Sequence, residues 1–413
     1  MEHDLLLHAH PELMEGKEMQ GCAGELKPEL PSSHTELQSA AAINLKKRIP
    51  GTFATKKSEE DHSTRLPIID LPTSQIPNHR ISSIAMNADT AAATVADDEI
   101  IYELSRCFRV YRSGRVERLL PASSVPPSLD PATGVDSKDV IINPSSGLSV
   151  RLYLPPSAAS GRDRKLPVLV QFHGGGFSVL STSHPLCHNY VNSLTAKAGV
   201  LTVSVEYRLA PENPIPAAYE DGLEAVRWVS SHAGGGCLEP WLSKFGDLEK
   251  IFLGGESAGG NIAHNVAMML GREGKKVEGV VLLCPGFWGK ERIGSENDQT
   301  RGSERKPEEL DGLWPIIYPR MTGLDDPCIN PVADGGRSLA ALGCRRALIY
   351  VAELDLLVER GRIYFEKLKE SGWGGEAEFM ETVGKGHCFF LFDPSTEKAE
   401  EFFERVAGFL NRE

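Results

Sequence analysis

Short, almost continuously apolar runs that alternate with helix-like stretches constrain this chain more than any other feature. Strands that are apolar on both faces are typical of a parallel sheet covered by helices. The alternation therefore predicts an α/β fold, with a mostly parallel central sheet and helices on both faces. The expected strands are 149–156, 167–172, 200–207, 251–254, 280–284 and 347–352, and the expected helices are 217–229, 261–270, 360–369 and 398–410.

Net charge, apolar runs and cysteine spacing exclude several classes of binding partner. The 413 residues carry a formal net charge of −13, which disfavours nucleic acid because phosphate binding needs a basic surface. No apolar run reaches the length of about 18 residues that predicts a membrane span. The eight cysteines are scattered, without a C-x-x-C pair or zinc-like spacing, so we expect reduced thiols and no metal site.

Residues 1–98 differ in composition from the rest of the chain. They are rich in Glu, Ser, Thr, Pro and Ala and nearly lack aromatic residues, so we expect a disordered extension. It could be a regulatory tail, a targeting remnant or an over-long gene model, with Met86 as a later start. Acidic residues fall early, for example Glu2 and Asp4, whereas transit peptides are poor in acids. We therefore expect a cytoplasmic protein, with a plastid address disfavoured.

Two segments interrupt the alternation of strands and helices. Ile100, Leu104 and Phe108 recur at helical spacing behind acidic residues, which predicts a helix. Residues 285–329 are first charged and then apolar and aromatic. An insertion of this length inside a compact fold is either a lid over a binding site or a surface excursion, and its sequence does not choose between them.

The sequence I-F-L-G-G-E-S-A-G-G-N, residues 251–261, places one serine among four glycines between an expected strand and an expected helix. In a turn this tight, Gly255 and Gly259 avoid the collisions that larger side chains would cause. Ser257 would then stand at a helix N-terminus, where partial positive charge favours a developing anion. The alternative is a glycine-rich loop without chemistry, and the strand-to-helix context favours a nucleophile.

A serine hydroxyl needs a base, and the base needs an orienting acid. His387, late in the chain after a Gly-x-Gly turn, is the candidate base, whereas His264 and His188 fit a structural role better. The acid should follow the strand at 347–352. Asp355 is the preferred candidate there, and Glu353 is second. The chain order Ser257, Asp355, His387 is the one expected for an α/β-hydrolase sheet.

Three consecutive glycines follow the strand at 167–172. Such a run lets successive backbone N–H groups turn toward one point, so Gly174 and Gly175, together with the N–H of Ala258, are predicted to form an oxyanion hole. A phosphate-binding loop is the rival interpretation. The chain lacks both G-K-[ST] and G-x-G-x-x-G, so we expect no nucleotide and no cofactor.

Four motifs carry a specific resemblance over residue 99 to the C-terminus. They are H-G-G-G-F at 173–177, Y-R-L-A-P-E-N-P-I-P-A-A-Y-E-D-G-L at 207–223, G-E-S-A-G-G-N-I-A-H at 255–264 and G-H-C-F-F-L-F at 386–392. In this order they closely resemble plant carboxylesterases of the hormone-sensitive-lipase group of α/β-hydrolases. One departure is Glu256, where Asp is the commoner choice in that group; we expect it to support the loop.

The resemblance implies a serine carboxylesterase that hydrolyses short-chain or small-metabolite esters through an acyl-enzyme, with the triad Ser257, Asp355 and His387. It implies an α/β-hydrolase domain over 99–413, with a cap from about 99–125 and 286–328. Relatives in the same group are hydroxyisoflavanone dehydratases, lactone-forming tuliposide-converting enzymes and gibberellin receptors, which bind hormone without catalysis. Because those receptors lack the histidine that stands here as His387, we expect an enzyme.

Overall fold

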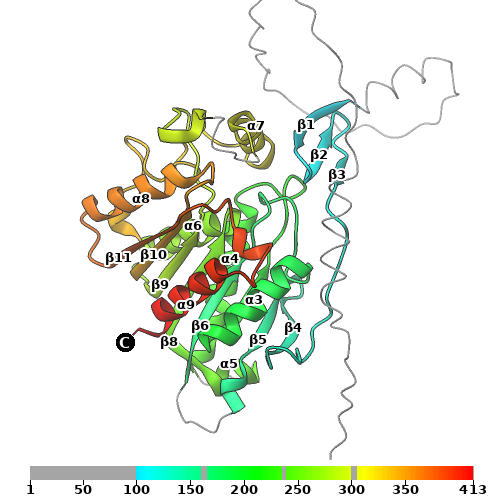
Figure 1. The fold of residues 1–413 in the computed structure, drawn as a ribbon, viewed down its shortest axis with the longest axis vertical. Helices are drawn as coiled ribbons and strands as arrows, with labels where there is room; N and C mark the ends of the chain where they lie inside the picture. Colours follow the sequence, from blue (N-terminus) through cyan, green and yellow to red (C-terminus); the bar gives the residue numbers. More distant parts are fainter. Residues whose placement is uncertain (1–98, 160–164, 235–238, 299–304, 413) are drawn as a thin grey trace, which may run out of the picture. The chain divides into compact units, whose positions relative to one another are not determined.

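An 8-stranded sheet, in the order β11-β10-β9-β8-β6-β7-β5-β4, forms the centre of the fold (Figure 1). Neighbouring strands from β7 to β11 run parallel, and β5 and β4 join antiparallel at one edge. The strands are β4 (Asp136–Asn143), β5 (Leu148–Leu154), β6 (Leu166–Phe172), β7 (Leu201–Glu206), β8 (Gly246–Glu256), β9 (Val277–Leu283), β10 (Cys344–Ala352) and β11 (Glu376–Thr382). The predicted α/β class is confirmed, and every predicted strand coincides with an observed one.

This computed structural model describes residues 99–159, 165–234, 239–298 and 305–412. The described residues all belong to one unit, Ile84–Glu413. The predicted disordered extension, residues 1–98, lies outside the described residues, as do Cys22 and Cys237. Within the described ranges no helix has both the length and the apolar character to cross a membrane. The six cysteines in those ranges are all free thiols, as expected.

Helices cover both faces of the sheet (Figure 1). α3 (Pro185–Ala198) and α9 (Glu397–Asn411) pack on one face, and α4 (Ala217–Ser231), α6 (Ala258–Arg272) and α8 (Val358–Glu370) pack on the other. Successive strand residues alternate between these two cores: Val168 and Val170 face the α4/α6 side, and Leu169 faces the α3/α9 side. The sequence pattern missed α3, because it buries polar His188 and Asn192 beside its apolar residues.

The prediction of a helix that carries Ile100, Leu104 and Phe108 is wrong. The segment instead forms β1 (Ile100–Leu104) and β2 (Phe108–Tyr111), which join β3 (Val116–Arg118) in a 3-stranded antiparallel sheet. Leu104 and Phe108 belong to different strands and pair across the turn, so their spacing of four residues comes from a hairpin and not from one face of a helix. Arg106, with φ 62°, makes the turn that brings Leu104 opposite Phe108, and both side chains are buried.

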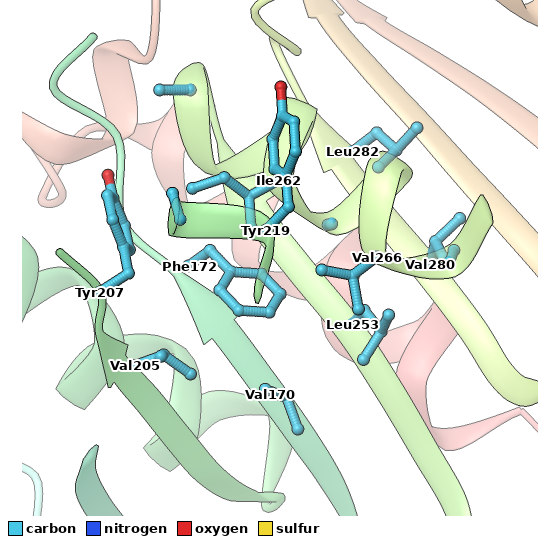
Figure 2. Packing of buried hydrophobic residues seen from close by; sticks show 14 of the residues in the cluster. Val170, Phe172, Val205, Tyr207, Tyr219, Leu253, Ile262, Val266, Val280 and Leu282 are labelled. Atoms are coloured by element: carbon cyan, nitrogen blue, oxygen red, sulfur yellow. The ribbon is translucent and has the colours of Figure 1, made fainter. Parts of the chain in front are cut away.

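The core beneath the carboxyl ends of the strands is tightly packed. Figure 2 shows Phe172 of β6 among Ile262 and Val266 of α6 and Tyr219 of α4. A Cβ atom on Gly222 would lie 3.0 Å from Phe172 Cε1 and 2.9 Å from Val266 Cγ2, so α4 approaches the sheet through its glycine. This packing fixes where β6 ends and where α6 begins.

An aromatic stack joins α9 to the turn that follows His387. Phe402 stacks on Phe390 with ring centroids 4.0 Å apart and meets Tyr350 edge-on at 4.9 Å. Phe402→Ala should lower the free energy of unfolding by about 3–5 kcal/mol, because it leaves a cavity among these rings. The exposed Phe392 offers a matched control, and Phe392→Ala should change stability by less than about 0.5 kcal/mol. Urea denaturation measures both, and equal losses would contradict the packing role of Phe402.

Candidate active site

Ser257 occupies a strained turn between β8 and α6. Its backbone has φ 55° and ψ −118°, a conformation that costs on the order of 1–3 kcal/mol for a residue with a side chain. The strain persists because the surroundings leave no alternative: a Cβ on Gly255 would lie 2.3 Å from Gly259 C, and one on Gly259 would lie 1.9 Å from Phe172 O. The turn raises Ser257 at the N-terminus of α6, as the sequence predicts.

His387 is hydrogen-bonded to Asp355. Its Nδ1 lies 2.7 Å from Asp355 Oδ2, and the Asp355 side chain is 2% exposed. Leu357 N donates to Asp355 Oδ1 at 3.0 Å and fixes the carboxylate after β10. With Nδ1–H donating to Asp355, Nε2 is left as the basic nitrogen of a neutral ring. The structure thus brings together the histidine and the acid that the sequence preferred.

Glu353, the second candidate for the acid, does not contact His387. Its Oε2 accepts from Gly384 N at 2.8 Å, while Leu354 N donates to Lys385 O at 2.9 Å. These two bonds attach the loop that carries His387 to the end of β10. Glu353 therefore supports the loop, and Asp355 orients the ring.

Ser257 and His387 both lie next to the end of β9, which runs between the strands that precede the serine and the acid. Ser257 N donates to Leu283 O at 2.9 Å, and the side-chain sulfur of the next residue, Cys284, lies within 4.8 Å of a His387 ring nitrogen. The described residues include no hydrogen bond between Ser257 Oγ and His387. The bond between base and nucleophile is often long until substrate binds.

The structure corrects the expectation for Gly174. Its N–H donates to Glu256 Oε1 at 2.7 Å and is therefore not available to an oxyanion. Glu256 Oε2 accepts from Gln171 Nε2, also at 2.7 Å, so the buried carboxyl group joins β6 to the glycine loop. The sequence analysis expected a loop-supporting role for Glu256 but could not show which amide it engages.

Three backbone amides remain available as donors to an oxyanion, those of Gly175, Gly176 and Ala258. Within the described ranges none of these three N–H groups has a hydrogen-bond partner. Gly175 (φ 101°) and Gly176 (φ 58°) have backbone conformations that favour glycine, and a Cβ on Gly175 would lie 2.2 Å from Val179 O. The sequence analysis chose the first and second glycines of the run, whereas the structure leaves the second and third free.

Apolar side chains from β1 and α7 (Pro307–Ile317) border the glycine loop. A Cβ on Gly176 would lie 3.3 Å from Leu104 Cδ2 and 3.7 Å from Leu313 Cδ2. Tyr102 Oη donates to Glu309 O at 2.7 Å and ties the hairpin to α7. The two segments that interrupt the alternation of strands and helices, the hairpin and the insertion with α7, are therefore joined beside the free amides.

The other histidines named in the sequence analysis take structural roles. His264 Nδ1 lies 3.0 Å from Tyr364 Oη inside the core, and burial lowers the pKa of His264 to about 3, so its ring stays neutral. His188 Nδ1 lies 3.0 Å from Tyr153 Oη. Both assignments agree with the sequence analysis.

Burial raises the pKa of Glu256 to about 8, against a usual value of 4.5. The unfolded chain releases this proton near pH 4.5 and the folded chain only near pH 8, so stability falls as the pH rises between these values. The fall from this group alone is on the order of 5 kcal/mol. Glu256→Gln should remove it while its amide oxygen still accepts from Gly174 N. Urea denaturation at pH 5 and pH 8.5 tests this, and parallel pH profiles for wild type and variant would contradict it.

Comparisons with known proteins agree with the observed fold. The family described as alpha/beta hydrolase fold matches residues 169–391. "Tuliposide A-converting enzyme 2, chloroplastic" from Tulipa gesneriana is 47% identical over 320 residues, which cover 78% of this chain and 81% of the relative. "2-Hydroxyisoflavanone dehydratase" from Glycyrrhiza echinata is 43% identical, and the match covers 78% of this chain and 99% of the relative. "Probable carboxylesterase 2" from Arabidopsis thaliana is 42% identical, and the match covers 76% of this chain and 97% of the relative.

These relatives overturn the expectation of a cytoplasmic protein, because three tulip relatives are named chloroplastic or amyloplastic. That expectation rested on early acidic residues, and a targeting address is read by a receptor and not by average composition.

Solved structures give the same fold. A hyperthermophilic esterase from the archaeon Pyrobaculum calidifontis superposes with a TM-score of 0.56 at 27% identity, covering 66% of this chain and 84% of that chain. A thermostable carboxylesterase from a metagenomic library superposes with a TM-score of 0.56 at 27% identity, covering 67% of this chain and 88% of that chain. Sequence relatives, family match and observed sheet agree, and the chain belongs to the α/β-hydrolase family.

Proposed function

We propose that this protein is a serine carboxylesterase that hydrolyses small carboxylic esters at a triad of Ser257, His387 and Asp355. The observation that carries the proposal is the 2.7 Å hydrogen bond between His387 Nδ1 and Asp355 Oδ2, at the same sheet edge as the strained serine. The likeness to solved esterases and to plant relatives supports the reaction class.

The geometry suits acyl transfer in two halves. His387 Nε2 takes the proton of Ser257 Oγ while the oxygen attacks the ester carbonyl, and His387 then gives the proton to the departing alcohol. The oxyanion accepts hydrogen bonds from the amides of Gly175, Gly176 and Ala258, each worth about 3 kcal/mol of barrier. Water, deprotonated by the same histidine, releases the acid. Asp355 keeps the ring in the required tautomer throughout.

We further propose that the β1–β3 sheet and the insertion around α7 act as a cap over this pocket. Leu104 and Leu313 bring apolar surface to the third glycine, which favours small apolar groups next to the scissile bond. The insertion is anchored by a buried ion pair in which Arg360 Nε of α8 lies 2.6 Å from Glu296 Oε1. A lid held in this way restricts water near the reacting ester.

A second candidate is an acyl transfer in which a hydroxyl group of the acyl chain itself attacks the acyl-enzyme and forms a lactone. The 47% identity with the tuliposide A-converting enzyme favours this internal transfer. The 43% identity with the dehydratase makes elimination a third candidate reaction. All three reactions use the same base and amides. Product analysis separates them, since hydrolysis gives a free acid, internal transfer a lactone and elimination an unsaturated product. The names of the tulip relatives also support a plastid location.

Ser257→Ala should lower ester turnover by about 10³-fold or more, because the acyl-enzyme cannot form. The variant should also lose covalent labelling by a fluorophosphonate. Ser178, a nearby buried serine whose Oγ has no hydrogen-bond partner in the described chain, offers a matched control. Ser178→Ala should keep both the labelling and most of the turnover of p-nitrophenyl butyrate. Undiminished turnover in Ser257→Ala would refute the proposed nucleophile.

Asp355→Asn should reduce kcat about 10⁴-fold, because an amide favours the wrong histidine tautomer. Glu353→Gln changes a carboxylate in the same loop, keeps an acceptor for Gly384 N, and should cost less than about 10-fold. Steady-state kinetics on one ester compares the two variants. The opposite order of effects would make Glu353 the orienting acid.

A further inference from the structure

Two cysteines lie against the histidine of the triad. Cys284 follows β9, Cys388 follows His387, and the ligand atoms of the three residues all lie within 4.8 Å of one another. Across the described chain this is the one group of three or more His, Cys, Asp or Glu residues close enough to hold a metal ion. The sequence analysis expected no metal site, because the spacing of the cysteines along the chain does not show that Cys284 and Cys388 come together.

The three ligand types suit a thiophilic divalent ion. Zn²⁺ and similar ions bind cysteine sulfur and imidazole nitrogen, usually with four ligands in a tetrahedron. Tetrahedral zinc–ligand bond lengths place the ligand atoms about 3.6–3.8 Å apart. Side chains whose ligand atoms already lie within 4.8 Å need only a small contraction to reach this geometry.

The surroundings of His387 match those of a metal-binding histidine. Such a histidine almost always donates its other ring N–H to a carboxylate or carbonyl, which orients the ring. Here His387 Nδ1 is bonded to Asp355 Oδ2 at 2.7 Å, which leaves Nε2 for an ion. Nε2 is also the atom assigned to take the proton of Ser257.

The two cysteines are buried, whereas the histidine is partly exposed. Cys284 N donates to Tyr350 O at 2.7 Å, and Leu391 N donates to Cys388 O at 3.0 Å. Cys284 is 1% exposed and Cys388 is 2% exposed, whereas the His387 side chain is 31% exposed. His387 is therefore the one ligand of the three that solvent reaches, and water would supply the fourth ligand of a tetrahedral ion.

We propose that Cys284, Cys388 and His387 form a binding site for a thiophilic divalent ion such as Zn²⁺ or Cd²⁺, which excludes catalysis by occupying the base. Binding releases both thiol protons to solvent and changes no oxidation state. The binding half of the proposal stands on the three ligands alone, and the inhibitory half rests on the proposed esterase function.

Titration of the phosphine-reduced protein with Cd²⁺ tests the binding half. Wild type should bind a single ion per chain and show the ultraviolet charge-transfer band of cadmium–thiolate bonds. Cys284→Ala and Cys388→Ala should each weaken binding by about 100-fold or more, since loss of an outer partner alone costs 10–100-fold. Cys344, a buried thiol at the start of β10, offers a matched control, and Cys344→Ala should keep the full band. If circular dichroism shows that an alanine variant does not fold, the serine variant at the same position takes its place.

Activity measurements separate the two halves. Cd²⁺ should abolish wild-type ester turnover, and a chelator should restore it. Ser257→Ala should bind Cd²⁺ as wild type does, because the serine is not one of the ligands. A wild-type protein that binds the ion but hydrolyses no ester would refute the function and leave the site intact. An active esterase without the charge-transfer band, or with a band that survives in Cys284→Ala and Cys388→Ala, would overturn the site.

Discussion

The approach of α6 to the end of β6 is the constraint on which the site depends. A Cβ on Gly259 would lie 1.9 Å from the carbonyl oxygen of Phe172, so only glycine allows the helix to start so close to the strand. That proximity holds Ser257 in a strained backbone conformation with φ 55° and ψ −118°, and it places the first amide of α6 next to the glycine loop that continues β6. The proposed nucleophile and the proposed oxyanion donors thus both depend on one packing contact, supported by the core around Phe172.

A buried carboxyl group fixes the geometry on the other side of the serine. Glu256 receives hydrogen bonds from Gly174 N and Gln171 Nε2, both at 2.7 Å, in a region without solvent. The protein thereby uses the first amide of the glycine run for positioning and leaves the next two for chemistry. Preorganised donors of this kind need no rearrangement when charge develops, which is why they lower a barrier effectively. Burial of the carboxyl group makes this arrangement sensitive to pH.

Much of the fold and the chemistry could be predicted from residue patterns. The strands could be predicted because parallel sheet strands are apolar on both faces. Chain order and glycine spacing led to the candidates Ser257, Asp355 and His387, and the structure joins His387 to Asp355. The hairpin at Ile100–Tyr111 was not predicted, because two apolar residues four positions apart can pair across a turn as well as line one face of a helix, and only the pairing of the strands decides. Targeting was also misjudged, since early acidic residues say little about an address that a receptor reads.

The sequence alone determined the sheet class and the identity of the groups that can react, because both depend on residue types at fixed spacings. Only the tertiary structure decided which groups meet. It selected Asp355 over Glu353 as the partner of His387, assigned Gly174 to Glu256, and brought Cys284 and Cys388 to the same histidine. The reason is that hydrogen bonds and ligand sets form between atoms a few ångströms apart, and their residues lie as many as 104 positions apart in the chain.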